Sequence, residues 1–191
     1  NHGYHNVLMD SVRGASNRLN SDQSYTENFT NGGYLASFDD NGFTWQYGGG
    51  SNNEWWNESN NYVAWCWKAG GTAVSNTDGD ITSSVSVNEE AGFSIATYTG
   101  STASGALTVG HGLGKKPAWV MIKRRDDTGE WIVGHQALAT DAFANNKFLK
   151  LDSSSSTFTN SLVWGAEPTT TVTQIVSDGN AGASNLTSSG T

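Results

Sequence analysis

Four histidines are the first residues of this sequence that could hold a metal ion or move a proton: His2, His5, His111 and His135. No two of them lie four residues apart, the spacing that places a zinc-binding pair on one helix face. His2 and His5 could share a metal from an extended terminus, although solvated terminal histidines explain the pair more simply. His111 lies in the segment VGHGLGKKP, which continues into strand-like residues. A turn with a capped or exposed histidine therefore explains this segment better than a phosphate-binding loop.

A short acidic segment, NTDGD, could bind calcium. Its oxygen-bearing side chains Asn76, Asp78 and Asp80 alternate around Gly79, as ligands do in calcium loops. The segment lacks a bidentate glutamate at the place that such loops require, so a solvated turn is the better interpretation and calcium the alternative. Apart from calcium, no cofactor is expected.

No group of residues has the pattern of a catalytic site. None of the serines lies in a G-x-S-x-G elbow, and the adjacent Glu89 and Glu90 lack the aromatic neighbours of a glycosidase site. Cys66, the single cysteine, stands between Trp65 and Trp67. Strand alternation predicts that it is a buried, unreactive thiol. We therefore expect no catalytic residues and no enzyme activity.

Aromatic residues gather in a region rich in Asn and Gly. They are Trp45, Tyr47, Trp55, Trp56 and Tyr62. Such rings can stack on a sugar while neighbouring amides bond its hydroxyls, but they could equally belong to a core or a subunit interface. Adjacent Trp55 and Trp56 cannot both point inward in a regular strand. We expect one of them to meet solvent, a loop or a partner chain.

The composition limits the functions that these residues could serve. The 191 residues carry a formal net charge of −8 and only 15% are charged, so nonspecific nucleic-acid binding is not expected. No apolar run reaches the roughly 18 residues of a membrane span. Eight Trp, six Tyr and seven Phe provide enough apolar area for a packed core. A polar, weakly charged surface is typical of an extracellular β protein.

Short β-branched or aromatic segments, bounded by turn residues, must position these side chains. The expected strands are residues 62–68, 92–98, 119–123, 131–134, 147–151 and 172–177. The best candidate for a helix is a short stretch at residues 134–146. This pattern predicts an all-β fold, an antiparallel sandwich of the jelly-roll or concanavalin-like kind.

Two stretches of the chain have similar features in the same order. His5 and His135 lie 130 residues apart, and the tripeptide FTN at residues 29–31 recurs 129 residues later at 158–160. The order predicts a repeat, with the chain as a window across a tandem array. Equivalent histidines favour a structural hydrogen bond over catalysis. The predicted parts are the C-terminal half of a first unit (residues 1–70), a linker (71–91) and the N-terminal part of a second unit (92–191).

Three segments carry a resemblance to a known family: YVAWCWKAGG at residues 62–71, DGDITSSVSVNEEAGFSIATYTG at 78–100 and VGHGLGKKPAWVMIKRR at 109–125. They resemble a repeated domain of structural proteins from marine tailed phages, mostly tail-fibre and other virion-surface proteins. That domain is similar to concanavalin-like sandwiches. The resemblance covers nearly the whole chain and implies a structural place on the virion surface, without catalytic residues to carry over.

Two functions remain open. The first is a structural and adhesive module of a phage tail fibre or other virion surface appendage, with contact to host surface glycans as a further role. The alternative is a lectin-like carbohydrate-binding module of a secreted or cell-surface protein. We expect a homo-oligomer that contacts other virion proteins, with Trp55 or Trp56 near a subunit contact and without membrane insertion.

Overall fold

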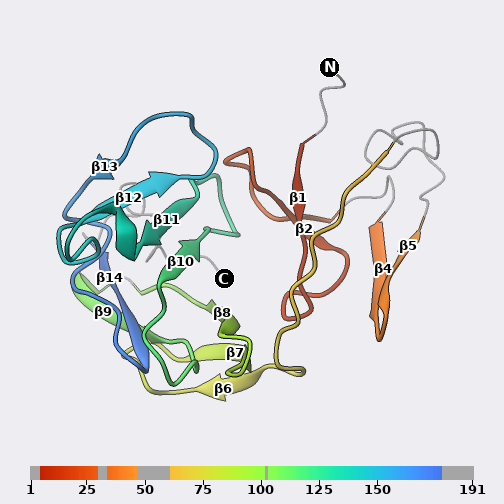
Figure 1. The fold of residues 1–191 in the computed structure, drawn as a ribbon, viewed down its shortest axis with the longest axis horizontal. Helices are drawn as coiled ribbons and strands as arrows, with labels where there is room; N and C mark the ends of the chain where they lie inside the picture. The colour runs from red at the N-terminus through yellow and green to blue at the C-terminus, as the bar shows by residue number, and fades with distance from the viewer. Residues whose placement is uncertain (1–4, 30–33, 47–60, 102, 178–191) are drawn as a thin grey trace.

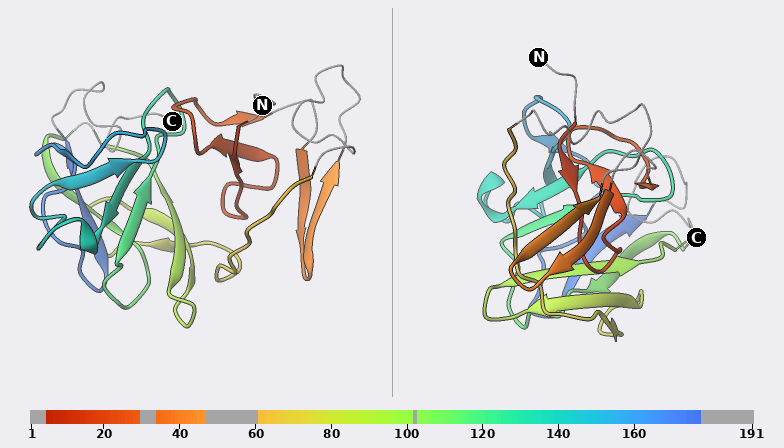
Figure 2. Two further views of the ribbon diagram at one scale, coloured as in Figure 1. Left: turned by 45° about the horizontal axis from the view of Figure 1, so that its top comes forward. Right: turned by 90° about the vertical axis from the view of Figure 1, so that its right-hand side faces the viewer.

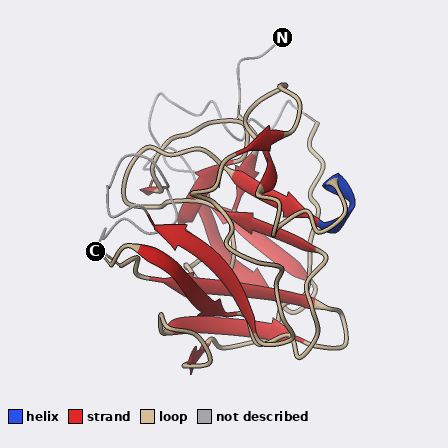
Figure 3. Cartoon of the chain, turned by 90° about the vertical axis from the view of Figure 1, so that its left-hand side faces the viewer, coloured by secondary structure: helices blue, strands red, loops and turns tan. Residues whose placement is uncertain are grey.

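The computed structural model describes residues 5–29, 34–46, 61–101 and 103–177. Almost all of its regular structure is β, and the strands pair antiparallel in several small sheets (Figure 1). A single 3₁₀ turn, η1 (Gln136–Leu138), is the helical element of this described part (Figure 3). The predicted all-β, sandwich-like fold is confirmed, whereas the helix expected near residues 134–146 is reduced to η1 and a series of turns. No helix in the described part is long and apolar enough to cross a membrane.

The N-terminal region, residues 5–46, contains one three-stranded sheet and one hairpin. The sheet has the order β1-β2-β3, and the hairpin β4-β5 closes through a two-residue turn at Asp40 and Asn41, as the segment DDNG predicts. In Figure 2 the hairpin stands apart from the other strands. The strands are β1 (Val7–Leu8), β2 (Asn17–Asn20), β3 (Asn28–Phe29), β4 (Tyr34–Asp39) and β5 (Gly42–Gln46).

The C-terminal region, residues 74–177, forms the larger body of the molecule. Its sheets have the orders β6-β7-β8, β10-β11-β12-β13 and β14-β9, and an isolated bridge from Ile81 to Val109 links the first to the third. The strands are β6 (Val74–Asn76), β7 (Ser83–Asn88), β8 (Phe93–Tyr98), β9 (Gly105–Gly110), β10 (Trp119–Ile122), β11 (Ile132–His135), β12 (Lys147–Lys150), β13 (Phe158–Thr159) and β14 (Val172–Ser177).

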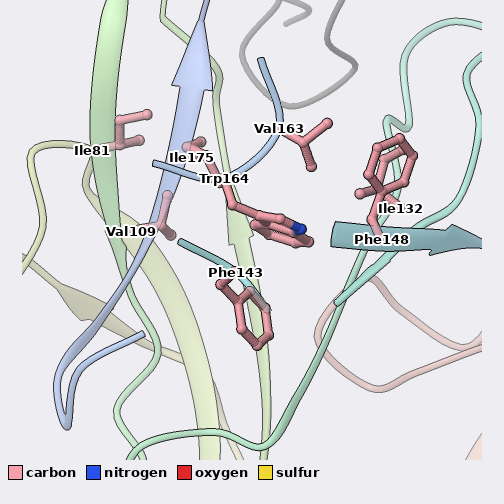
Figure 4. Packing of buried hydrophobic residues seen from close by; sticks show 8 residues of the cluster. All are labelled: Ile81, Val109, Ile132, Phe143, Phe148, Val163, Trp164 and Ile175. Atoms are coloured by element: carbon pink, nitrogen blue, oxygen red, sulfur yellow. The ribbon is translucent and has the colours of Figure 1, made fainter. Parts of the chain in front are cut away.

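One hydrophobic core lies between the sheets of the C-terminal region. Trp164 and Phe143 are completely buried at its centre, with ring centroids 5.1 Å apart (Figure 4). Gly134 of β11 lets these rings approach the sheet, because a Cβ there would lie 2.3 Å from the Phe143 ring. The buried cluster consists of Ile81, Val109, Ile132, Phe143, Phe148, Val163, Trp164 and Ile175.

Five of the six predicted strands are present, each within one residue of its expected ends. The sixth, residues 62–68, is wrong: this segment is in no strand, and most of its side chains are exposed. The expected burial of Cys66 fails with it, since the thiol is exposed. The apolar run was correctly seen as strand-like, but the described part of the chain pairs no strand with it.

The expected linker at residues 71–91 is also wrong. This stretch contains β6 and β7, and Val85 of β7 is only 2% exposed. Its many Ser and Thr residues suggested low complexity, yet their hydroxyls bond to neighbouring backbone. Ser83 donates to the Gly110 carbonyl at 2.8 Å, and Ser86 donates to the Gly71 carbonyl at 2.7 Å.

The three-stranded sheet of the N-terminal region corresponds closely to part of the C-terminal region. The order β1-β2-β3 matches β11-β12-β13 with antiparallel pairing throughout. The pairs Arg18–Asn28 and Phe148–Phe158 lie 130 residues apart, consistent with the predicted repeat. The histidines do not follow this correspondence: His5 precedes β1, whereas His135 ends β11.

Candidate binding surface

An exposed apolar strip, residues 62–67, connects the two regions and is the most unusual surface of the described chain. It has the sequence YVAWCW and runs extended, without ladder pairing. Val63 is 80% exposed, Trp65 74% and Trp67 59%. Apolar side chains in such continuous exposure usually mark a contact site, because leaving them in water is unfavourable.

The C-terminal end of the strip is fixed to the C-terminal region. The Trp67 ring stacks on Phe93 of β8 with centroids 6.4 Å apart and planes inclined by 19°. Just beyond the strip, the Lys68 carbonyl accepts a hydrogen bond from Asn88 at 3.3 Å. Gly70 passes so close to Val87 that a Cβ would collide with its backbone. These contacts hold the strip in an extended conformation.

The predicted aromatic candidates are only partly placed by the structure. Trp45 is half-buried on β5, and Tyr62 begins the exposed strip. Tyr47, Trp55 and Trp56 lie outside the described residues, so their expected role stays a prediction. The sequence interpretation missed Trp65 and Trp67 as surface residues because it assigned them to a paired strand. The absence of any charge before Lys68 was the signal that could have indicated a contact surface.

The calcium candidates do not converge on one point. Asp78 accepts a hydrogen bond from the Asn76 amide at 2.9 Å. Asp80 instead accepts from the backbone and hydroxyl of Thr108, at 3.0 and 2.7 Å. Among the described residues, no group of three or more His, Cys, Asp or Glu side chains could hold a metal ion. Asp80 therefore acts as a tie between the β6–β7 loop and β9.

The histidines form hydrogen bonds within turns and loops. Nδ1 of His111 accepts from the Leu113 amide at 3.1 Å, and burial lowers the pKa of this imidazole. Gly112 and Gly114 have φ of +70° and +62°, which supports the predicted glycine turn with a capped histidine.

The other two described histidines also have local partners. His135 caps η1 by accepting from the Ala137 amide at 3.1 Å. His5 lies 3.0 Å from a carboxylate oxygen of Asp22 and makes an edge contact with Tyr25. His2 lies outside the described residues.

A family model covers nearly all of this architecture. The model for a domain of unknown function, DUF7483, matches residues 1–189. The chain belongs to the DUF7483 family. No match is found among curated proteins or among solved structures.

The match of the DUF7483 model spans both regions, and hydrogen bonds join these regions directly. The Glu27 amide donates to the Arg125 carbonyl at 2.8 Å, and the Trp131 indole donates to the Asn20 carbonyl at 2.7 Å. Burial lowers the pKa of Lys123 to about 8, and its ammonium also reaches the Ser24 carbonyl at 3.4 Å. The loop between β10 and β11 thus supports the N-terminal sheet.

A buried charged cluster completes this contact. The Arg13 side chain is only 5% exposed and donates to Glu27 at 2.7 Å, to Asp10 and to the Leu8 carbonyl. Arg125 approaches the second oxygen of Glu27 at 2.7 Å from the other region. Glu27 is therefore shared between one arginine of each region.

Proposed function

We propose that this chain is a structural and adhesive module of a phage tail fibre or another virion surface appendage. The carrying observation is the matching strand order of β1-β2-β3 and β11-β12-β13 with a shared 130-residue spacing. Extended appendages are commonly built from repeated units, because each unit needs to contact only its neighbours. The sequence resemblance to repeated phage domains supports the same assignment.

The surface chemistry supports a structural role outside the cell. The chain has few charges for its length and a net charge of −8, which disfavours contact with nucleic acid or anionic membranes. The proposed partners are copies of the same chain and other virion proteins. The proposal assigns no catalytic activity to the chain.

Immunogold electron microscopy of virions from the encoding phage tests this function. Antibody raised against the whole chain should label the tail fibres or another surface appendage. Label-free particles, with the chain recovered only from infected-cell lysate, would contradict the proposal. Antibody that has been absorbed with the purified chain provides the matched control.

A lectin-like carbohydrate-binding module is the second candidate, and the exposed rings favour it. Trp65 and Trp67 have centroids 6.5 Å apart and lie open to solvent, which suits stacking on sugar rings. A glycan array compared between the wild-type chain and Trp65→Ser tests this function. Binding that is lost in the variant would favour the lectin, whereas no binding by either protein would contradict it.

A further inference from the structure

The apolar strip at residues 62–67 resembles a strand that is normally covered on both faces. It contains no charge, no Pro and no Gly, and its aromatic and β-branched residues favour extended structure. Strands buried on both faces have such continuous apolar sequences, whereas half-exposed strands alternate apolar with polar residues. Side chains from both alternating sets, Val63 and Trp65 in one and Tyr62 in the other, are exposed. The strip therefore presents two uncovered apolar faces.

The chemistry of the strip favours a protein strand over a sugar. A glycan-binding site combines aromatic rings with several side chains that bond sugar hydroxyls. Within the strip only the Tyr62 hydroxyl is such a group, because the other side chains are Val, Ala, Trp and Cys. An extended protein segment would instead satisfy the backbone groups by ladder pairing and cover the side chains.

A second copy of this chain is the occupant that fits best. Identical uncharged apolar segments pair readily because no like charges face each other. Residues 61–73 contain a single charged side chain, Lys68, so the approach of two strips meets little local repulsion. A two-fold axis brings the same surface of both copies together, which a self-complementary strip allows.

We propose that residues 62–67 form a self-association strand, which pairs with the same strip of a second copy. Trp65 and Val63 are then covered by the partner, while Trp67 stays anchored on Phe93. This contact deepens the proposed structural function, since it supplies one joint of the appendage. It rests on that function only for its biological setting.

Sedimentation velocity of the full chain, from about 1 to 100 µM, measures the association. The wild type should shift from monomer to dimer as its concentration rises. Trp65→Ser should raise the dimer dissociation constant about thirtyfold, the loss expected for a central interface tryptophan. Trp119→Ser is the matched control, because Trp119 is 55% exposed on β10, outside the strip, and this change should leave association unaltered.

Cys66 supplies a second measurement that is specific to the strip. As the only cysteine, it can be labelled with a maleimide without any substitution, and it is exposed in the isolated chain. Its labelling should slow as the wild-type chain associates and should become independent of concentration in Trp65→Ser. Circular dichroism should show that both tryptophan variants remain folded, since each loses a solvent-exposed ring.

Three results would overturn this inference. A wild-type chain that stays monomeric over the whole range would do so, as would a dimer that Trp65→Ser leaves intact. Dimerisation with unchanged Cys66 labelling would place the contact at another surface. Failure of the virion labelling, together with strip-dependent dimerisation, would reject the proposed function while leaving the self-association strand in place.

Discussion

The two regions of the chain contain the same three-strand arrangement but are stabilised in different ways. In β12 of the C-terminal region, Phe148 is buried in the apolar cluster. At the corresponding position of β2, 130 residues earlier, stands Arg18, whose pKa is lowered by burial. The same backbone pattern thus has an apolar core in one region and polar side chains in the other.

This difference makes the N-terminal region dependent on the C-terminal region. Its sheet has short strands, and three or more strands need an apolar face or a packing partner for independent stability. The partner is the β10–β11 loop, where the Gly129 amide donates to the Ser24 carbonyl at 2.8 Å. Similar strand order therefore does not imply similar stability; the side chains between the sheets decide it.

Removing the central ring of the core should have the largest effect. Trp164→Ala should lower the free energy of unfolding by about 4 kcal/mol, because a fully buried indole is lost and its cavity remains. Urea unfolding measured by circular dichroism gives this value. The N-terminal region should unfold together with the core in this variant. An N-terminal sheet that survives the loss of the core would contradict its dependence.

Breaking the buried charged cluster should have a smaller and more local effect. Arg13→Met should cost about 3 kcal/mol for the N-terminal region, since Asp10 loses its arginine and Glu27 keeps only Arg125. Amide exchange in β1, β2 and β3 measures it.

Arg125→Met is the matched comparison for Arg13→Met. The Arg125 side chain is 43% exposed, so its loss should cost about 1 kcal/mol or less. Equal costs for the two variants would show that burial of the guanidinium does not control the cluster.

Acid should weaken the N-terminal region through Glu27. Burial raises the pKa of Glu27, but hydrogen bonds from Arg125 and Arg13 outweigh it and hold the pKa below its ordinary value of 4.5. The unfolded chain then binds this proton more readily than the folded chain, so stability falls as the pH drops below about 4.5. Glu27→Gln should flatten this dependence in amide exchange of β3. An unchanged acid profile in that variant would assign the effect to other carboxylates.

His111 should give the C-terminal region a different and smaller pH response. Burial lowers the pKa of His111 below 6.5, so the unfolded chain takes up the proton first on acidification. Stability of this region should fall as the pH drops from about 7 towards 5. Thermal unfolding at several pH values measures it, and His111→Asn should remove the slope. A slope that persists in the variant would exclude His111 as its source.

Much of the C-terminal region could be predicted from sequence because its strands carry their own signals. Segments such as WVMI in β10 combine β-branched and aromatic residues between turn residues. β7 was missed because SSVSVN resembles a flexible linker, and only tertiary contacts reveal that Ser83 and Ser86 are buried. Short hydroxyl side chains can fill a sheet interior when a carbonyl accepts their proton.

The candidate surface was less predictable for a related reason. Composition indicated that residues 62–68 favour an extended chain, and the structure agrees on that conformation. Whether a partner strand covers them depends on contacts distant in sequence, which local patterns do not contain. Trp65 and Cys66 were therefore assigned to an interior, although they lie at the surface.

Native-state hydrogen exchange, resolved by residue, tests the central difference between the two regions most directly. Amides of β9, β11 and β14 should exchange only through global unfolding, whereas those of β1, β2 and β3 should exchange at a lower free energy. The two sets should also respond differently to Arg13→Met, which should accelerate exchange in the N-terminal sheet alone. Equal exchange free energies in both regions, shifted together by that variant, would show that they form one cooperative unit and would contradict this account.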